Sequence, residues 1–330
     1  MNARKVRQTT LDMISRHVDI DDVFVTRTIE QSDQSLDEII ERRYPLVLSG
    51  GGDGTAMRVI EQMRRKVARR NAAGGDFAVP KFGLLKLGTG NGWAGLLETP
   101  GKVEPIWALR QSRAHELKFT PFNMIEAENR LFHFGGFGLD ALVLNNYINL
   151  KNKFTSGFLW KLANSMAGYL WATFAISAPQ VMLRHFALHA RIVNNSDDPV
   201  YRVGPDGALV ELPLKKGETI YDSRTLLIGF GTTTNYGFQL KVYPWACAKP
   251  GYMQLRTADT NVPQVIRNIR PIWTGHPGVP GLADWLVKDV IVESAESMPF
   301  QLGGDPEGYR ERAHFKVSDF TVDMLDFRRP

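Results

Sequence analysis

Hydrophobic and polar positions along the chain change their pattern near residue 120. Before it, short apolar runs at 46–48 and 82–87 are each followed by a segment with helical spacing. After the first run, one face of the predicted helix carries Val59, Ile60, Met63 and Val67. Strands that alternate with helices in this way predict a three-layer α/β domain with a parallel sheet over residues 1–120.

Beyond residue 120 the period becomes two. The segment 186–192 alternates cleanly, with Phe186, Leu188, Ala190 and Ile192 on one face, and turns follow at 194–199 and 204–207. Further strands are predicted at 208–214, 225–230, 253–257 and 315–325, whereas the Pro-, Trp- and Gly-containing stretch 263–281 is interpreted as an irregular insertion. The second domain, 121–330, is therefore predicted to be a β-rich sandwich, and its final strands could pack back toward the first domain.

Composition restricts the class of protein. The chain has 330 residues, 43% hydrophobic and 23% charged, which indicates about two globular domains and argues against disorder. The single cysteine, Cys247, excludes an intramolecular disulfide and a cysteine-rich zinc site; we expect it to be buried in a reducing compartment. The histidines show no paired metal-ligand spacing, and His133 and His185 are expected to be structural.

Two glycine-rich turns follow the two N-terminal strands. Residues 49–55 read Ser-Gly-Gly-Gly-Asp-Gly-Thr, and Gly88-Thr89-Gly90-Asn91 follows the second strand. Glycines let backbone N–H groups turn toward a phosphate, and two such turns at one end of a parallel sheet would form a single crevice. Because a carboxylate repels phosphate, Asp53 is expected to hold a cation or accept a proton.

The two motifs LVLSGGGDGT and GLLKLGTGNGWAGLL resemble the diacylglycerol kinase catalytic domain family. This family includes bacterial lipid kinases and sphingosine and ceramide kinases, and it is distantly similar to NAD kinases. The resemblance continues through Phe134–Ala141, residues 225–257 and Asp305-Pro306-Glu307, so it covers roughly residues 20–330 in the family's motif order. It implies an α/β domain followed by a β-rich domain, with a nucleotide cleft between them.

The resemblance also implies ATP and Mg²⁺ as cofactors and gives roles to individual residues. Asp53 is the candidate general base or metal contact, Glu307 its catalytic partner, Asp305 a metal ligand, and Asp140 a ligand for the polar head of the acceptor. Asp305 and Glu307 also lie in a Gly-rich turn, where acids are common without any catalytic role. The nucleotide-binding candidates are Gly50, Gly51, Gly52, Gly54, Thr55, Gly88, Thr89, Gly90 and Asn91.

The sequence departs from the family pattern at four places. Pro250 stands where the family usually has an acid that helps to organise metal, and Pro306 replaces the glycine between the two late acids. Lys86 replaces the proline that usually precedes the second glycine turn. The first 22 residues show no apolar opening strand. These departures leave a non-enzymatic relative as one reading.

Two segments bear on whether the protein contacts a membrane. The segment 162–183 has no charge and could span a bilayer by length, but its Ala, Gly and polar residues favour a buried or surface-capping helix. Aromatic and basic residues within 151–184 suit a membrane interface, although plain core packing explains them equally well. Five basic residues within 64–70 are expected to form a solvated face, with an anionic membrane as second reading and nucleic acid third.

Three functions remain open on these residues. The first is a lipid kinase that phosphorylates a hydroxyl of a diacylglycerol-like or sphingoid lipid; the others are a kinase of a soluble acceptor, and a non-enzymatic nucleotide- or lipid-binding protein. Because no secretory signal is visible, we expect a cytoplasmic protein that associates reversibly with anionic membranes and does not bind nucleic acid. The sequence is also compatible with a homodimer.

Overall fold

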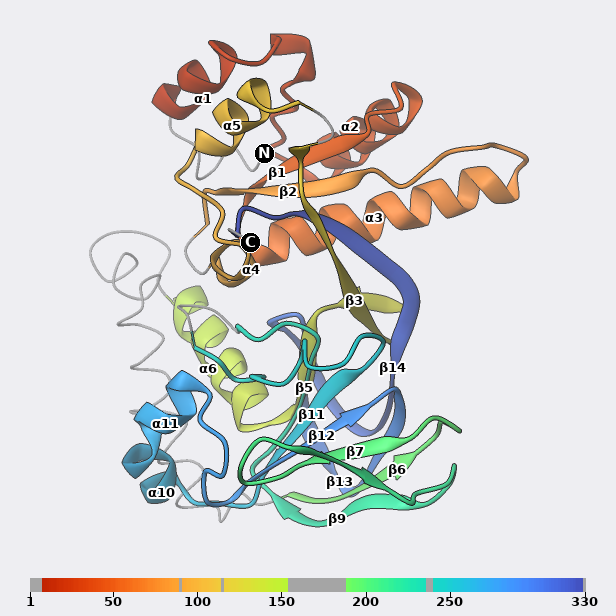
Figure 1. Ribbon diagram of the computed structural model, residues 1–330, viewed down its shortest axis with the longest axis vertical. Helices are drawn as coiled ribbons and strands as arrows, with labels where there is room; N and C mark the ends of the chain where they lie inside the picture. The colour runs from red at the N-terminus through yellow and green to blue at the C-terminus, as the bar shows by residue number, and fades with distance from the viewer. Residues whose placement is uncertain (1–7, 89–90, 114–115, 154–187, 236–239, 329–330) are drawn as a thin grey trace. The chain divides into compact units, whose positions relative to one another are not determined.

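The computed structural model describes residues 8–88, 91–113, 116–153, 188–235 and 240–328 (Figure 1). Contacts divide the chain into two compact units. The N-terminal unit comprises Met1–Phe122, Asn235–Gln239 and Asp319–Pro330, and the C-terminal unit comprises Asn123–Thr234 and Leu240–Ser318. The first is an α/β domain and the second is rich in β-strands, which confirms the predicted fold class.

The N-terminal unit is built on parallel strands. Strand β1 (Leu46–Gly51) pairs with β2 (Lys81–Lys86) from Leu46↔Lys81 to Gly51↔Lys86. The end of the long strand β14 (Asp305–Leu325) joins β2 in parallel at Met324↔Phe82. The helices of this unit are α1 (Gln8–Ser15), the short 3₁₀ helix η1 (Ile20–Asp22), α2 (Ile29–Glu41), α3 (Asp53–Ala72), α4 (Gly92–Leu96) and α5 (Glu104–Gln111).

Helix α3 packs through the face that its sequence predicts. Ile60, Met63 and Val67 are buried, and in β2 Phe82 and Leu84 are buried as well. Burial of such a side chain contributes about 1.5–3 kcal/mol, so this face holds the helix on the strands. The two strand–turn–helix units predicted from the sequence are therefore present.

The basic stretch of α3 is only in part the solvated face that we expected, since Arg65 and Arg69 are exposed but Lys66 and Arg70 are paired. Lys66 Nζ lies 2.7 Å from Asp37 and 3.0 Å from Asp33, and the Lys66 side chain is only 13% exposed. Arg70 contacts Asp37 at 2.9 Å and Glu41 at 2.8 Å. These acids lie on α2, so the interpretation is wrong for Lys66 and Arg70: both charges hold two helices together.

The C-terminal unit is a largely antiparallel sheet. Its strand order is β14-β13-β5-β10-β11-β12-β7-β8; β6 pairs with β13 and β9, and β4 pairs with β3. A long helix, α6 (Leu139–Lys153), directly follows β5. The strands are β3 (Phe119–Ala127), β4 (Arg130–Phe132), β5 (Phe134–Gly138), β6 (Leu188–Asn194), β7 (Val200–Val203), β8 (Leu209–Leu212), β9 (Thr219–Thr225), β10 (Leu227–Gly231), β11 (Met253–Ala258), β12 (Leu282–Val287) and β13 (Asp289–Leu302).

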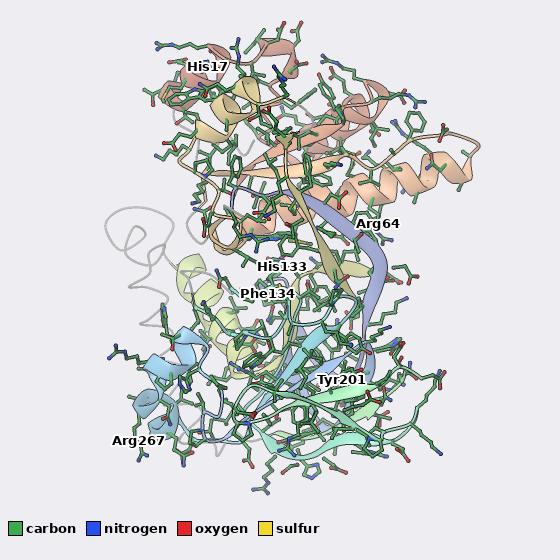
Figure 2. All side chains as sticks on the ribbon, viewed as in Figure 1. His17, Arg64, His133, Phe134, Tyr201 and Arg267 are labelled. Carbon is green, nitrogen blue, oxygen red and sulfur yellow. The ribbon has the colours of Figure 1, made fainter. Side chains whose placement is uncertain are left out.

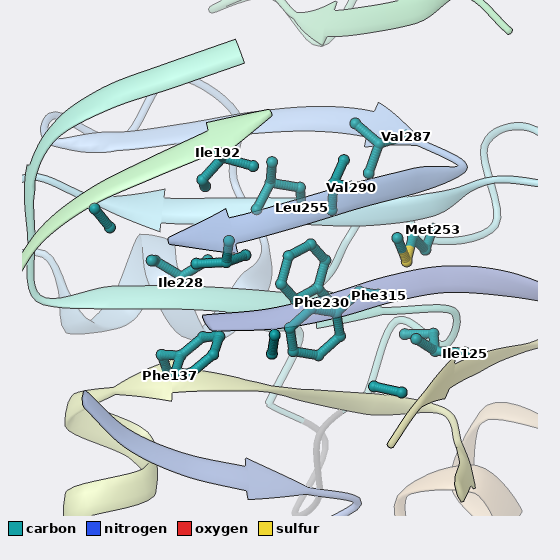
Figure 3. Packing of buried hydrophobic residues seen from close by; sticks show 14 of the residues in the cluster. Ile125, Phe137, Ile192, Ile228, Phe230, Met253, Leu255, Val287, Val290 and Phe315 are labelled. Atoms are coloured by element: carbon teal, nitrogen blue, oxygen red, sulfur yellow. The ribbon is translucent and has the colours of Figure 1, made fainter. Parts of the chain in front are cut away.

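Stacked aromatic rings form the centre of this unit's core (Figure 3). The rings of Phe230 and Phe315 are stacked with their centroids 4.1 Å apart, and the ring centroids of Phe137 and Phe300 are 4.8 Å apart. Ala190 and Ile192 of β6 are fully buried, which confirms the alternation read from the sequence. Phe186 and His185 lie outside the described residues.

The stretch predicted as an irregular insertion contains two short helices, so that prediction is wrong. Helix α10 (Val262–Arg267) starts with a capping box in which Asn261 and Gln264 satisfy each other's backbone N–H groups. Helix α11 (Ile269–Thr274) follows and ends at Gly275, which has a φ of 71°. Among the described residues no helix is long and apolar enough to cross a membrane, and the segment 162–183 lies outside them.

Candidate functional site

The two glycine-rich turns of the N-terminal unit touch through their backbones. A Cβ placed on Gly88 would lie 2.3 Å from Gly52 Cα and 2.6 Å from Gly52 N, so no side chain fits there. Parallel pairing of β1 and β2 brings both turns to the same strand end, and the absence of side chains allows the contact. The expected convergence of the two turns is thus present.

Asp53 connects the two turns. It is the first residue of α3, and its Oδ2 accepts a 2.7 Å hydrogen bond from Gly92 N while Oδ1 accepts one of 3.2 Å from Trp93 N. Removal of this carboxyl from water raises its pKa, and the two N–H groups oppose the rise. Asp53 therefore caps α4 and is at the same time a carboxylate that accepts a proton more readily than an exposed one.

The glycines on either side of Asp53 differ in the space around them. A Cβ on Gly51 would meet the Thr55 side chain at 2.7 Å, whereas a Cβ on Gly54 would have no neighbour within 4 Å. Gly52, which precedes α3, offers no side-chain cap, so the positive end of this 20-residue helix is not neutralised by one. An exposed glycine at the start of a long helix is the local arrangement that binds phosphate groups.

Asn91 shapes the second turn. Its backbone is left-handed, with a φ of 44° and a ψ of 39°, a conformation that asparagine tolerates better than most residues. Its side-chain amide donates to Gly88 O at 2.7 Å, which closes the turn on itself. The neighbouring candidates Thr89 and Gly90 lie outside the described residues, so their roles stay predictions.

A second group of candidate residues lies in the C-terminal unit, at the β13–β14 hairpin. Gly303 and Gly304 have φ values of 61° and 86° and form the two-residue turn, so Asp305 and Glu307 lie on the first part of β14. Glu307 forms a close ion pair with Arg130 of β4. The other guanidinium nitrogen of Arg130 is 3.7 Å from Asp305, whose side chain is 72% exposed.

Asp140 is held by the same hairpin through Gln301. The Gln301 side chain is fully buried; its Nε2 donates to Asp140 Oδ2 at 2.9 Å, and its Oε1 accepts from Gly304 N at 2.9 Å. Asp140 Oδ1 also accepts from Ala141 N at the start of α6. One amide side chain thus fixes both the Asp140 carboxylate and the turn that precedes Asp305.

These acids do not form a ready-made Mg²⁺ site. Among the described residues no three His, Cys, Asp or Glu side chains gather as metal ligands. Arg130 beside Asp305 and Glu307 places a positive charge where a metal ion would compete with it. A site formed by protein carboxylates alone therefore does not fit, and Asp305 as a metal ligand stays a prediction.

Sequence reasoning missed Arg130 and Gln301. Arg130 follows the tight turn at Glu128-Asn129, where both residues have positive φ, and carries no motif of its own. Gln301 is an isolated polar residue in the apolar run 298–302, and this was a usable signal, since a buried amide requires partners. Their partners lie up to 177 residues away in sequence.

His133 has the structural role that we expected from its apolar surroundings. Burial lowers the pKa of His133 to about 3, so the ring is neutral, and its edge contacts Phe134 with centroids 4.7 Å apart (Figure 2). Cys247 is exposed, so the expectation of a buried cysteine is wrong. Pro250 is exposed and precedes Gly251, whose φ is 77°.

One family model matches the N-terminal part of the chain. Residues 2–121 match the model of the diacylglycerol kinase catalytic domain, which confirms the resemblance inferred from the two glycine motifs. No curated protein matches the chain.

Solved structures extend the likeness over most of the chain. One putative diacylglycerol kinase from Bacillus anthracis str. Sterne has 15% identity and a TM-score of 0.59, over 92% of this chain and 83% of the other. A second putative diacylglycerol kinase from the same organism has 15% identity and a TM-score of 0.58, over 92% of this chain and 84% of the other. An NAD kinase from Archaeoglobus fulgidus in complex with ATP has 11% identity and a TM-score of 0.46, over 98% and 91%, too low a score to carry an argument. At these identities the similarity shows the two-domain fold.

Proposed function

We propose that this protein is a lipid kinase that transfers the γ-phosphate of ATP to a hydroxyl of a diacylglycerol-like or sphingoid lipid. The observation that supports it best is the contact between Gly52 and Gly88, with Asp53 joining both turns. This arrangement lies within the stretch that matches the diacylglycerol kinase catalytic domain.

The glycine turns are suited to holding the phosphate donor. Phosphoryl transfer needs the donor fixed in line with the acceptor and its charge compensated, rather than covalent help from the protein. Gly54 leaves open space beside the first turn of α3, where backbone N–H groups and the helix dipole favour an anion. Thr55, packed on Gly51, keeps this turn in place.

Asp53 is the proposed general base. Its raised pKa makes it a better proton acceptor than an exposed aspartate, and a base need only take the proton of the attacking hydroxyl. Glu307 is the proposed partner, although its ion pair with Arg130 must loosen before it can accept a proton. Asp140, oriented by Gln301, is proposed to bind the polar head of the acceptor.

Mg²⁺ enters this proposal only with the nucleotide. The cation usually binds through substrate phosphates and one or two carboxylates, and it neutralises charge on the phosphates when bound. Since the described acids do not form a site by themselves, we expect weak metal binding without ATP and much stronger binding with it.

Two alternatives stay open beside the lipid kinase. A soluble acceptor is compatible with the same glycine turns, because they do not specify the hydroxyl that is phosphorylated. A non-enzymatic nucleotide-binding role is favoured by one observation: both Asp53 oxygens already accept backbone hydrogen bonds. The aromatic composition of 151–184 supports a lipid acceptor and reversible association of a cytoplasmic protein with anionic membranes.

The test is label transfer from [γ-³²P]ATP with Mg²⁺ to a panel of diacylglycerols, sphingoid bases and, as soluble acceptor, NAD. Labelled lipid from wild type, with at least a hundredfold loss in Asp53→Asn, would support the proposal. Label in NAD alone would show the soluble-acceptor kinase. ATP binding without transfer to any acceptor would show the non-enzymatic reading.

A further inference from the structure

Helices α10 and α11 carry large apolar side chains that face solvent. Ile266 is 52% exposed, Ile269 44% and Trp273 38%. Ile266 lies on α10, whereas Ile269 and Trp273 are four positions apart on α11, and the two helices are separated only by Asn268. No residue of the six-residue helix α11 is buried, so packing inside the protein does not account for its apolar side chains. We call Ile266, Ile269, Trp273, Arg267 and Arg270 the α10–α11 surface.

The charges on this surface are of one sign. Between Asp259 and Asp284 the chain has no acidic residue, whereas Arg267 and Arg270 lie among the exposed apolar side chains. Lys241 adds a third cation nearby, because its backbone N–H donates to Trp273 O at 3.1 Å. Figure 2 shows the Arg267 side chain extending from α10 away from the strands.

We propose that the α10–α11 surface docks on anionic lipid bilayers. Isoleucine and tryptophan side chains enter the interfacial layer, where tryptophan is enriched, and the cations beside them contact lipid phosphates. A cationic and apolar surface in a segment without acidic residues is complementary to such a bilayer. This inference rests on the proposed lipid kinase, because a bilayer is where its acceptor would be found.

The other basic cluster of the chain is less suited to this role. In α3, Lys66 and Arg70 are paired with acids of α2, and Arg65 contacts Glu61 at 2.8 Å. A bilayer would have to compete with these ion pairs. Within the described part of the chain neither Arg267 nor Arg270 forms an ion pair, and both are exposed, so their charge is available to lipid phosphates.

The experiment measures sedimentation of the full chain with vesicles of phosphatidylcholine containing 30 mol% phosphatidylglycerol. The apolar variant is Ile266→Ser/Ile269→Ser/Trp273→Ser, and its control is Val210→Ser, a 55% exposed apolar residue on β8. The charge variant is Arg267→Gln/Arg270→Gln, and its control is Arg224→Gln, an exposed arginine on β9. Thermal melts of all variants verify that each is folded.

We expect the apolar variant to bind at least tenfold more weakly than wild type. The charge variant should lose about 30-fold, which corresponds to about 1 kcal/mol per cation, and most of this difference should vanish at 1 M salt. The two controls should bind like wild type. Equal binding of folded variants and wild type, or no sedimentation of wild type, would overturn the proposal.

A second readout separates this inference from the proposed activity. Transfer to a water-soluble, short-chain diacylglycerol should be the same in wild type and in both variants, whereas transfer to long-chain lipid in vesicles should fall with binding. If no lipid is phosphorylated while vesicle binding still depends on the α10–α11 surface, the kinase proposal fails and the docking proposal stands. If short-chain transfer proceeds but folded variants keep full vesicle activity and binding, docking at this surface fails.

Discussion

Gly88→Ala tests the contact between the two glycine turns. The new Cβ would lie 2.3 Å from Gly52 Cα, whereas two carbon atoms attract best at about 3.5–4.0 Å, so the turns must separate by roughly 1.2–1.7 Å. Gly88 does not have a positive φ, so the alanine backbone is unstrained and the effect is steric. The same displacement would break the 2.7 Å bond from Gly92 N to Asp53, because it would lengthen to about 4 Å.

The cost follows from these two effects. Overpacking costs about 1–3 kcal/mol, and a hydrogen bond to a charged group contributes about 1.5–3 kcal/mol. We therefore expect Gly88→Ala to destabilise the N-terminal unit by roughly 2.5–6 kcal/mol, a fall of about 5–24 °C in Tm. Gly54→Ala is the matched control, since its Cβ meets nothing within 4 Å and alanine favours the helix.

The assay is calorimetric unfolding of wild type and both variants, followed by ATP titration of those that are folded at 20 °C. Gly88→Ala should melt earlier and bind ATP more weakly. Gly54→Ala should melt at the wild-type temperature or above. A Gly88→Ala protein with the wild-type Tm and ATP affinity would refute the contact.

Three further changes test single groups. Asp53→Asn should lower transfer at least a hundredfold in the label assay, and a loss below about threefold would exclude a role as base. Gln301→Leu should raise the KM for lipid severalfold and leave the KM for ATP unchanged, because the amide orients Asp140; equal changes in both constants would argue against this. For Asp326, burial raises the pKa but hydrogen bonds from Arg328 and Thr120 outweigh it and hold the pKa at about 2. Asp326→Asn should therefore lower the free energy of unfolding by roughly 2 kcal/mol at pH 7. The wild type has the full benefit of the lowered pKa only above the pKa of the unfolded state. In urea titrations the difference between the two proteins should therefore disappear as the pH falls from about 4 to about 2.

Local patterns in the sequence were sufficient for the elements around the glycine turns. The apolar run before Gly50 and the helical spacing after Thr55 encode a strand and a helix within a few residues of the turn. The stretch 263–281 was interpreted as irregular because it mixes Pro, Trp and Gly, although proline in the first helical turn is favourable and Asn261 caps α10.

Contacts between distant segments could not be inferred in this way. Lys66 pairs with Asp33 and Asp37, which lie on α2, before strand β1. The spacing of residues within α3 gives no information about these partners. In the same way, Asp53 was expected to hold a cation or take a proton, but its first partners are the N–H groups of Gly92 and Trp93, about 40 residues later. Asp53 caps α4 only because the fold brings the two turns together.

The central claim is that the first turn of α3 receives the nucleotide phosphates. Its most direct test is ATP titration of Gly54→Leu beside Gly95→Leu, since each glycine has open space around its Cβ and lies in a helix that follows one of the turns. Both variants should remain folded. We expect Gly54→Leu to raise the Kd for ATP at least tenfold and Gly95→Leu to change it less than twofold. Wild-type affinity in a folded Gly54→Leu protein would contradict the central claim.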